Sequence, residues 1–119
     1  MWIRNSEADK LLGVATVDLY VPSLNFVFGE AECPGEVSVI SMFRLDPKFY
    51  DQRDDKLLFH RTVKEAVHEL GHTFGLIHCG HPNCVMFFSN SIYDTDLKNE
   101  GFCCRCGQMV RKAIERKCV

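Results

Sequence analysis

The sequence lacks several features that would place it in other classes of protein. Its 119 residues include no repeat, low-complexity tract or Gly/Ser-rich linker. No hydrophobic run approaches the ~20 residues that cross a bilayer, and the first residues do not form a secretory leader. The net charge of -2 provides no basic excess, which argues against nucleic acid or an anionic membrane as a partner. We therefore expect a single domain over residues 1–119, located in the cytoplasm.

Cysteine and histidine are abundant instead, mostly in the second half of the chain. Seven cysteines are many for this length, and the number is odd. In a secreted domain they would indicate disulfides plus one leftover thiol. Without a leader, and with short paired spacings, bound metal is the better interpretation, and disulfides remain the alternative. Four of the five histidines fall within residues 68–81.

The first half of the chain has the composition of β-structure. Residues 15–21, 25–32 and 36–45 are rich in β-branched and aromatic side chains and are separated by proline- and glycine-containing turns. The short Cys33-Pro34-Gly35 link predicts that the second and third of these strands are antiparallel neighbours. Residues 1–12 are expected to form a polar helical remnant or an ordered tail.

Helical periodicity begins near residue 57 and continues to residue 74. Val63, Val67, Leu70 and Phe74 recur at helical spacing and predict one buried stripe. Gly75 is a plausible helix stop. A non-periodic segment of roughly 25 residues follows, a length usually explained by function or by a tie such as metal. A last helix over residues 104–118 completes an α+β chain.

The central motif is His68-Glu69-Leu70-Gly71-His72, followed by Gly75 and His78. Two histidines at i and i+4 on a helix project from one face, about 6 Å apart, and can reach one ion. Gly75 lets the chain reverse so that His78 becomes the third ligand. Three neutral imidazoles leave zinc one open position, as in a catalytic site. His60 is expected at the surface or in the core, and His81 is a weaker competitor for the place of His78.

Glu69 lies about 100° around the helix axis from the first histidine, which suits a water on the metal rather than a ligand role. We predict that Glu69 is the general base that takes a proton from zinc-bound water and passes it to the leaving amine. Two alternatives remain: a helix that carries two histidines by chance, and a zinc-binding interaction module without catalysis.

Four cysteines in two pairs form a second candidate site, namely Cys79, Cys84, Cys103 and Cys106. Paired thiolates from separate segments are typical of a closed, structural zinc site. Such a site would fix both ends of the long loop, one residue from His78. Cys104 adjoins Cys103, but only Cys103 has the CxxC spacing with Cys106. Cys33, Cys104 and Cys118 are interpreted as non-ligands.

These residues together resemble the archaemetzincins, a branch of the metzincin zinc peptidases. The resemblance rests on HExxHxxGxxH followed directly by Cys79, then Cys84-Val85-Met86, then the Cys103–Cys106 pair. The motif region covers roughly residues 63–106. Residues 25–31 and 41–45 also look like strands of the family.

The resemblance implies a metzincin-like (zincin) fold, with a mixed, twisted β-sheet packed on the active-site helix. It implies two zinc ions, one on the three histidines and one on the four cysteines. Met86 matches the methionine of the Met-turn beneath the catalytic zinc, although a buried methionine would look the same. The upper part would span about residues 1–75 and a zinc-stapled lower part about 76–119. An N-terminal strand and helix usual in the family are expected to be missing, as in a fragment of a longer chain.

The expected substrate is a short or N-terminal peptide. In metzincins the edge strand of the upper sheet pairs with extended substrate, and here that strand would be residues 25–32. Glu30 and Glu32 on it would favour basic or N-terminal-amine substrates, unless they are only solvated edge charges. Tyr93 is a lesser candidate for stabilising the tetrahedral intermediate. A nucleic-acid-binding cysteine module with a basic last helix is the third interpretation, and nothing in the sequence indicates an oligomeric state.

Overall fold

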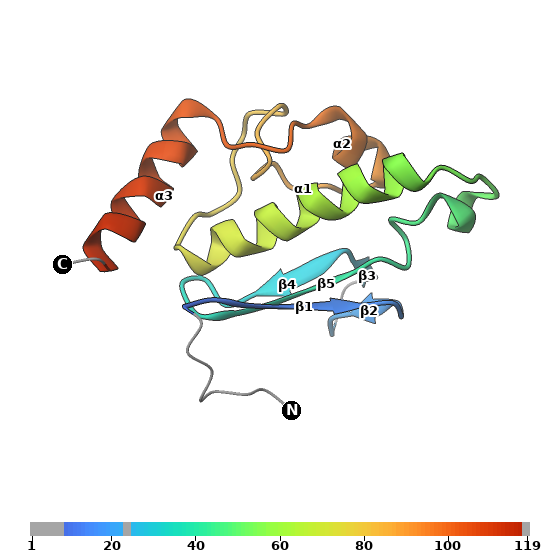
Figure 1. Ribbon diagram of the computed structural model, residues 1–119, viewed down its shortest axis with the longest axis horizontal. Coiled ribbons are helices and arrows are strands. Elements are labelled where there is room, and N and C mark those ends of the chain that lie inside the picture. Colours follow the sequence, from blue (N-terminus) through green and yellow to red (C-terminus); the bar gives the residue numbers. More distant parts are fainter. Residues whose placement is uncertain (1–8, 23–24, 118–119) are drawn as a thin grey trace.

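A computed structural model of the chain describes residues 9–22 and 25–117. It has three layers (Figure 1): a small sheet, the long helix α1 (Asp55–Thr73) lying across it, and above α1 a segment that contains the short helix α2 (Ile92–Leu97). Helix α3 (Cys104–Lys117) extends away at one end of the molecule. The chain is α+β, as the sequence predicts.

The main sheet is mixed and has the order β1-β5-β4. Strand β1 (Leu11–Ala15) is parallel to β5 (Val37–Ser41), and β4 (Gly29–Ala31) is antiparallel to β5. The predicted antiparallel pairing across the Cys-Pro-Gly link is therefore confirmed. This order leaves β4 as an edge strand, directly under α1. Ile40 in the central strand is fully buried, which places the core of the sheet between β5 and α1.

All three predicted strands have different bounds in the structure. The first was expected at residues 15–21, but β1 ends at Ala15 and only β2 (Leu19–Tyr20) follows. The expectation of a tail up to residue 12 is wrong for residues 11 and 12, because pairing with β5 decides where the strand runs. Residues 1–8, also part of that tail, lie outside the described residues.

The second predicted strand, residues 25–32, is divided between two sheets. Strand β3 (Phe26–Val27) pairs with β2 in a small antiparallel sheet, and β4 pairs with β5. The buried Phe28 lies at the switch, and its carbonyl accepts a hydrogen bond from the Ser41 backbone at 2.9 Å. The third strand ends at Ser41 rather than at residue 45. A turn and the 3-10 helix η1 (Pro47–Tyr50) follow it.

Helix α1 begins at Asp55, close to the predicted start near residue 57, and ends beside the predicted stop at Gly75. The Asp54 side chain accepts from the backbone N–H of Leu57 and caps the first turn. At the other end Gly75 has a φ of 95°, the left-handed conformation that glycine adopts without strain. The predicted helix stop is thus confirmed, and the chain reverses toward residue 78.

The buried face of α1 differs from the expected one. Val63, Val67, Leu70 and Phe74 are only half-buried. The buried positions are mostly polar: Arg61, Glu65, His68, Glu69, Gly71 and Thr73. The reason is that α1 lies between two layers and meets the upper one through ion pairs and hydrogen bonds rather than through hydrocarbon alone.

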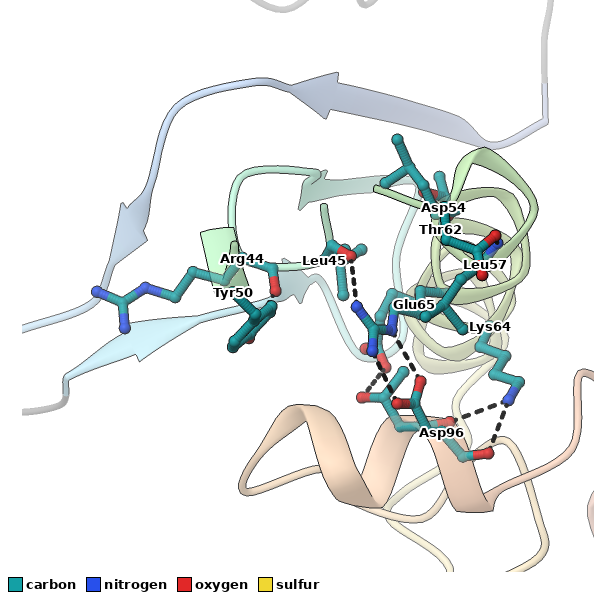
Figure 2. A network of polar contacts seen from close by, with 12 residues as sticks. Arg44, Leu45, Tyr50, Asp54, Leu57, Thr62, Lys64, Glu65 and Asp96 are labelled. Atoms are coloured by element: carbon teal, nitrogen blue, oxygen red, sulfur yellow. Dashed lines mark hydrogen bonds and ion pairs between the residues drawn. The ribbon is translucent and has the colours of Figure 1, made fainter. Parts of the chain in front are cut away.

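Polar contacts attach α2 to α1 (Figure 2). Arg61 makes two hydrogen bonds of 2.8 Å to the carboxylate of Asp96 and one of 3.1 Å to the Leu45 carbonyl. Lys64 donates to the carbonyls of Thr95 and Asp96 at the end of α2. Helix α2 lies in the segment that the sequence predicts to be irregular. Its six residues are too few for helical periodicity to be visible.

A cluster of buried hydrophobic residues lies at the C-terminal end of α1, away from the contacts with α2. It comprises Leu76, Cys79, Cys84, Val85, Met86 and Cys106, with Val67, Phe74, Phe102, Cys103 and Val110 packed against it. This cluster joins the end of α1 to the start of α3. The boundary near residue 75 between an upper and a lower part stays a prediction, and it coincides with the end of α1. Among the described residues, no helix has both the length and the apolar character needed to cross a membrane.

Candidate metal centre and catalytic cleft

The three histidines of the motif converge. His68 and His72 project from the last turns of α1, and the bend at Gly75 returns the chain so that His78 joins them. Their ring centroids are 4.8, 5.4 and 4.9 Å apart, and one nitrogen of each ring lies within 4.8 Å of the others. Such a spacing allows one ion to contact all three rings.

Backbone carbonyls fix the orientation of two of these rings. His68 Nδ1 lies 2.7 Å from the Val85 carbonyl oxygen, and His72 Nδ1 lies 2.7 Å from that of Leu76. A carbonyl oxygen can only accept, so each Nδ1 carries the proton and each Nε2 keeps a free lone pair. Metal-binding histidines are usually held in this way. The donor set therefore fits a zinc ion on chemical grounds.

Burial and nearby charges keep two of the histidine rings, those of His68 and His78, neutral. Burial, followed by the neighbouring Lys98 cation, lowers the pKa of His68 to about 3. Burial and the nearby His72 lower the pKa of His78 as well. A neutral imidazole is the form that binds metal. His68 and His78 are therefore already neutral, the form that binds metal, at neutral pH.

Glu69 is buried against the edge of the sheet. A Cβ on Gly29 would lie 2.7 Å from Glu69 Oε2 and 2.7 Å from the Val39 carbonyl oxygen. Only glycine leaves room there for the carboxylate. Burial raises the pKa of Glu69 to about 8, and the charges of Glu65 and Glu30 add to the effect. A carboxyl group tuned in this direction is suited to accept and return a proton near neutral pH.

A pH-dependent stability follows from the raised pKa. In protein freed of metal at the histidines, we expect the free energy of unfolding to fall as pH rises from about 4.5 to about 8. The folded state holds the Glu69 proton more tightly than the unfolded chain, so this contribution is complete at low pH and is lost on ionisation. Its size should be on the order of a few kcal/mol.

Urea unfolding of the wild type and of Glu69→Gln across this pH range isolates the contribution, because glutamine does not titrate. The stability of the wild type relative to the variant should fall steadily from about pH 4.5 to about pH 8. A difference that does not change with pH would mean that Glu69 is ionised throughout.

The histidines and Glu69 line a cleft of about 560 Å³. The chain from Asn25 to Ala31, which includes β4, lines this cleft, and so do Ile77 and Phe88. The ring of Phe88 lies 4.9 Å from that of His78. The cleft thus combines a donor set of the kind that binds metal, a buried carboxyl group and a strand edge that has no partner strand among residues 9–22 and 25–117.

The four predicted cysteines also converge, with each Sγ within 4.8 Å of the others. The Sγ atoms of Cys79 and Cys103 are 3.9 Å apart, too far for a disulfide bond. All six described cysteines are free, and Cys104 is exposed and outside the cluster. Cys118 lies outside the described residues. This geometry favours Cys103 over Cys104 and metal over disulfides.

Neighbouring donors favour the thiolate of Cys103, whereas burial raises the pKa of Cys84 and of Cys106. The backbone N–H groups of Met86 and Cys103 point at Cys84 Sγ, at 3.5 and 3.3 Å. Hydrogen bonding from the Cys106 backbone is the main cause that lowers the pKa of Cys103 to about 7. The Arg105 guanidinium lies 3.8 Å from Cys79 Sγ. Arg105 is thus one basic residue of α3 that faces the cysteines rather than an external partner.

Met86 connects the two clusters. It is fully buried, and a Cβ on Gly71 would lie 2.5 Å from its sulfur, so α1 rests directly on it between the two helical histidines. The Met86 carbonyl accepts from the Cys79 backbone at 3.0 Å. The Met-turn role of Met86 stays a prediction.

Other candidates lie elsewhere. His60 pairs with Glu100, and His81 is exposed and accepts a bond from the Asn83 backbone. Tyr93 is 68% exposed and is not part of the cleft lining, so its suggested role is not supported. The Glu32 carboxylate accepts from the backbone of Glu36 and Val37, which makes it a turn cap.

Three residues near the site were not predicted: Gly29, Glu65 and Lys98. Glu65 shares a face of α1 with Glu69 at i, i+4 spacing, a signal that was available. Lys98 and Gly29 come from distant segments, and no local pattern marks them.

A long helix laid on a mixed sheet, ended by a glycine that returns a third histidine to the first two, is the arrangement of the metzincin-like folds. The chain belongs to peptidase family M54, whose family model matches residues 5–112. It is 50% identical over 111 residues to the archaemetzincin of Methanopyrus kandleri, a match that covers 92% of this chain and 60% of that protein. It is 52% identical over 114 residues to the archaemetzincin of Pyrococcus furiosus, with 95% and 58% covered.

Solved structures agree. The crystal structure of the Methanopyrus kandleri archaemetzincin superposes with a TM-score of 0.87 at 48% identity, covering 93% of this chain and 59% of that one. The Archaeoglobus fulgidus archaemetzincin, crystallised with malonate, gives a TM-score of 0.78 at 48% identity, with 85% and 60% covered. The chain therefore spans about three-fifths of the length of these relatives. The predicted family and fold are confirmed.

Proposed function

We propose that this chain is a zinc-dependent peptidase that hydrolyses short peptides or the N-terminal parts of longer ones. The observation that carries the proposal is the convergence of His68, His72 and His78 beside the buried Glu69 in one open cleft. Membership of a peptidase family supports it.

In this proposal His68, His72 and His78 hold one zinc ion, and a second is held by Cys79, Cys84, Cys103 and Cys106. Zinc on the histidines would polarise a peptide carbonyl and acidify a water molecule. The carbonyls of Val85 and Leu76 keep two of the rings aimed at the ion. The four cysteines leave no open position, so their ion would be structural.

Glu69 performs the proton transfers. Its carboxylate takes a proton from the attacking water and returns it to the nitrogen of the leaving amine. Contact with Gly29 and the sheet keeps the carboxylate beside the histidines, and burial excludes competing water. The raised pKa makes uptake of the proton from water more favourable than it would be for an ordinary carboxylate.

The free edge of β4 positions the substrate. Its outer side has no partner strand within the described sheet, and it lines the cleft. An extended peptide can add to this edge through backbone hydrogen bonds, which brings one of its carbonyls over the histidines without reading side chains. The exposed Glu30 remains available to attract a positively charged group, whereas Glu32 does not.

Zinc analysis combined with a peptide panel tests the proposal. We expect two zinc ions per chain, and cleavage of some peptides with free or acetylated N-termini. Removing the histidine-bound metal with a mild chelator should abolish cleavage, and added zinc should restore it. Cleavage that survives metal removal would contradict the proposal. Full zinc occupancy without cleavage of any peptide would instead favour a silent zinc-binding module.

A further inference from the structure

A buried ion pair lies directly behind the histidine cluster. It joins Glu65 of α1 to Lys98, the residue after α2, with 3.2 Å between Lys98 Nζ and Glu65 Oε1. The Lys98 side chain is 0% exposed and that of Glu65 is 3% exposed. Among the described residues, Lys98 is the largest side chain that is fully buried. A charge in such a position is costly unless it is paired and hydrogen-bonded.

The ammonium of Lys98 lies close to three groups, two of them on α1 and one in the segment that follows Met86. Besides Glu65 on α1, it donates to the Phe87 carbonyl at 3.0 Å. It also lies 3.5 Å from His68 Nδ1. Since that nitrogen already donates to Val85, the contact with His68 is one of proximity and not a hydrogen bond.

The segment that Lys98 holds is the one that orients His68. The Val85 carbonyl accepts from His68, Met86 supports α1 at Gly71, and the Phe87 carbonyl accepts from Lys98. Val85, Met86 and Phe87 are consecutive in the sequence. One segment therefore orients the His68 ring, supports α1 from below and is attached to Lys98. Glu65 is itself fixed by the Thr95 hydroxyl of α2 at 3.2 Å.

Stability alone does not account for this pair. Apolar residues of similar size in place of a buried ion pair are often neutral or stabilising. The pair also adds a cation beside a site that binds a cation, which would weaken metal binding if charge were all that mattered. Its geometry offers a different reason for its presence.

We propose that Lys98, paired with Glu65, is a positioning residue for the histidine metal site. It holds the Val85–Phe87 segment against α1 so that the Val85 carbonyl keeps the His68 ring aimed at the ion. Lys98 touches neither substrate nor metal and acts through this segment. The inference rests on the proposed metal-binding function of the three histidines.

Cobalt(II) titration of the full chain tests the inference, because cobalt bound to thiolates and cobalt bound to imidazoles have different absorption spectra. In Lys98→Met we expect the histidine site to bind cobalt about 10- to 100-fold more weakly, the usual effect of losing a residue that orients a ligand. The cysteine site should bind as in the wild type. Lys64→Met is the matched control. It also removes a lysine that joins α1 to α2, but one remote from Phe87 and His68, and both sites should keep their affinity.

A double variant separates positioning from charge balance and also covers failure of the single variant to fold. Glu65→Leu with Lys98→Met leaves no unpaired buried charge, so thermal stability should return. Affinity at the histidine site should remain weakened. Wild-type affinity in either Lys98 variant would overturn the inference. Absence of any metal at the histidines of the wild type would overturn the proposed function as well, and this result is distinct because it does not depend on Lys98.

Discussion

Replacement of Glu69 by glutamine is expected to lower kcat/KM for peptide hydrolysis by about 10²- to 10⁴-fold, the range that general-base catalysis contributes. Glutamine keeps the shape of the side chain but cannot accept the proton of the attacking water. The three histidines are unchanged, so the zinc content should equal that of the wild type. Initial rates on a cleaved peptide and zinc analysis of the same preparation measure both quantities.

Glu36→Gln is a control for this variant. Glu36 is an exposed glutamate that does not line the cleft, and its replacement should change the rate less than twofold, because surface substitutions have small effects (about ±0.5 kcal/mol). Hydrolysis at the wild-type rate in Glu69→Gln would show that another group accepts the proton. The role given to Glu69 would then be wrong even if the metal site is correct.

Replacement of Cys84 by serine is expected to release the zinc of the cysteine cluster and to lower the free energy of unfolding by several kcal/mol, since metal binding at a structural site is folding free energy. The histidine site should weaken as well. Val85, whose carbonyl orients His68, follows Cys84 directly in the sequence. Cys79 follows His78 directly, and its backbone N–H donates to the Met86 carbonyl.

Cys104→Ser is the matched control, because Cys104 is exposed and lies beside the cluster without joining it. It should keep both zinc ions and the wild-type melting temperature. Loss of a zinc ion in Cys104→Ser, with Cys103→Ser unaffected, would exchange the roles of these two cysteines. Thermal melts and zinc analysis of the three variants give the answer.

The histidine and cysteine clusters could be predicted because the residues that bring them together are close in sequence. A helix, a glycine three residues after the second histidine and a cysteine directly after the third fix most of the geometry through backbone rules. The CxxC spacing distinguished Cys103 from Cys104 in the same way. The histidines and Glu69 lie where the sequence indicated, and their roles remain part of the proposal.

The sheet was predicted less well because its strands are decided by distant partners. Residues 25–32 have uniform β-composition, and only pairing with β2 on one side and β5 on the other divides them at Phe28. Helix α2 is fixed by Arg61 and Lys64 of α1 rather than by its own six residues. The buried polar face of α1 was not predicted for the same reason, because Arg61 and Glu65 pair with Asp96 and Lys98 from a distant segment. The cytoplasmic location stays a prediction.

The position of Gly29 bears on which bond of a bound peptide would be cut. The same three-residue strand provides the edge to which a substrate would add and the surface on which the Glu69 carboxylate rests. The backbone that would align the peptide is therefore the same backbone that the Glu69 carboxylate contacts. Changes of loop length elsewhere that leave this strand in contact with Glu69 should therefore alter which peptides enter the proposed site rather than where they are cut.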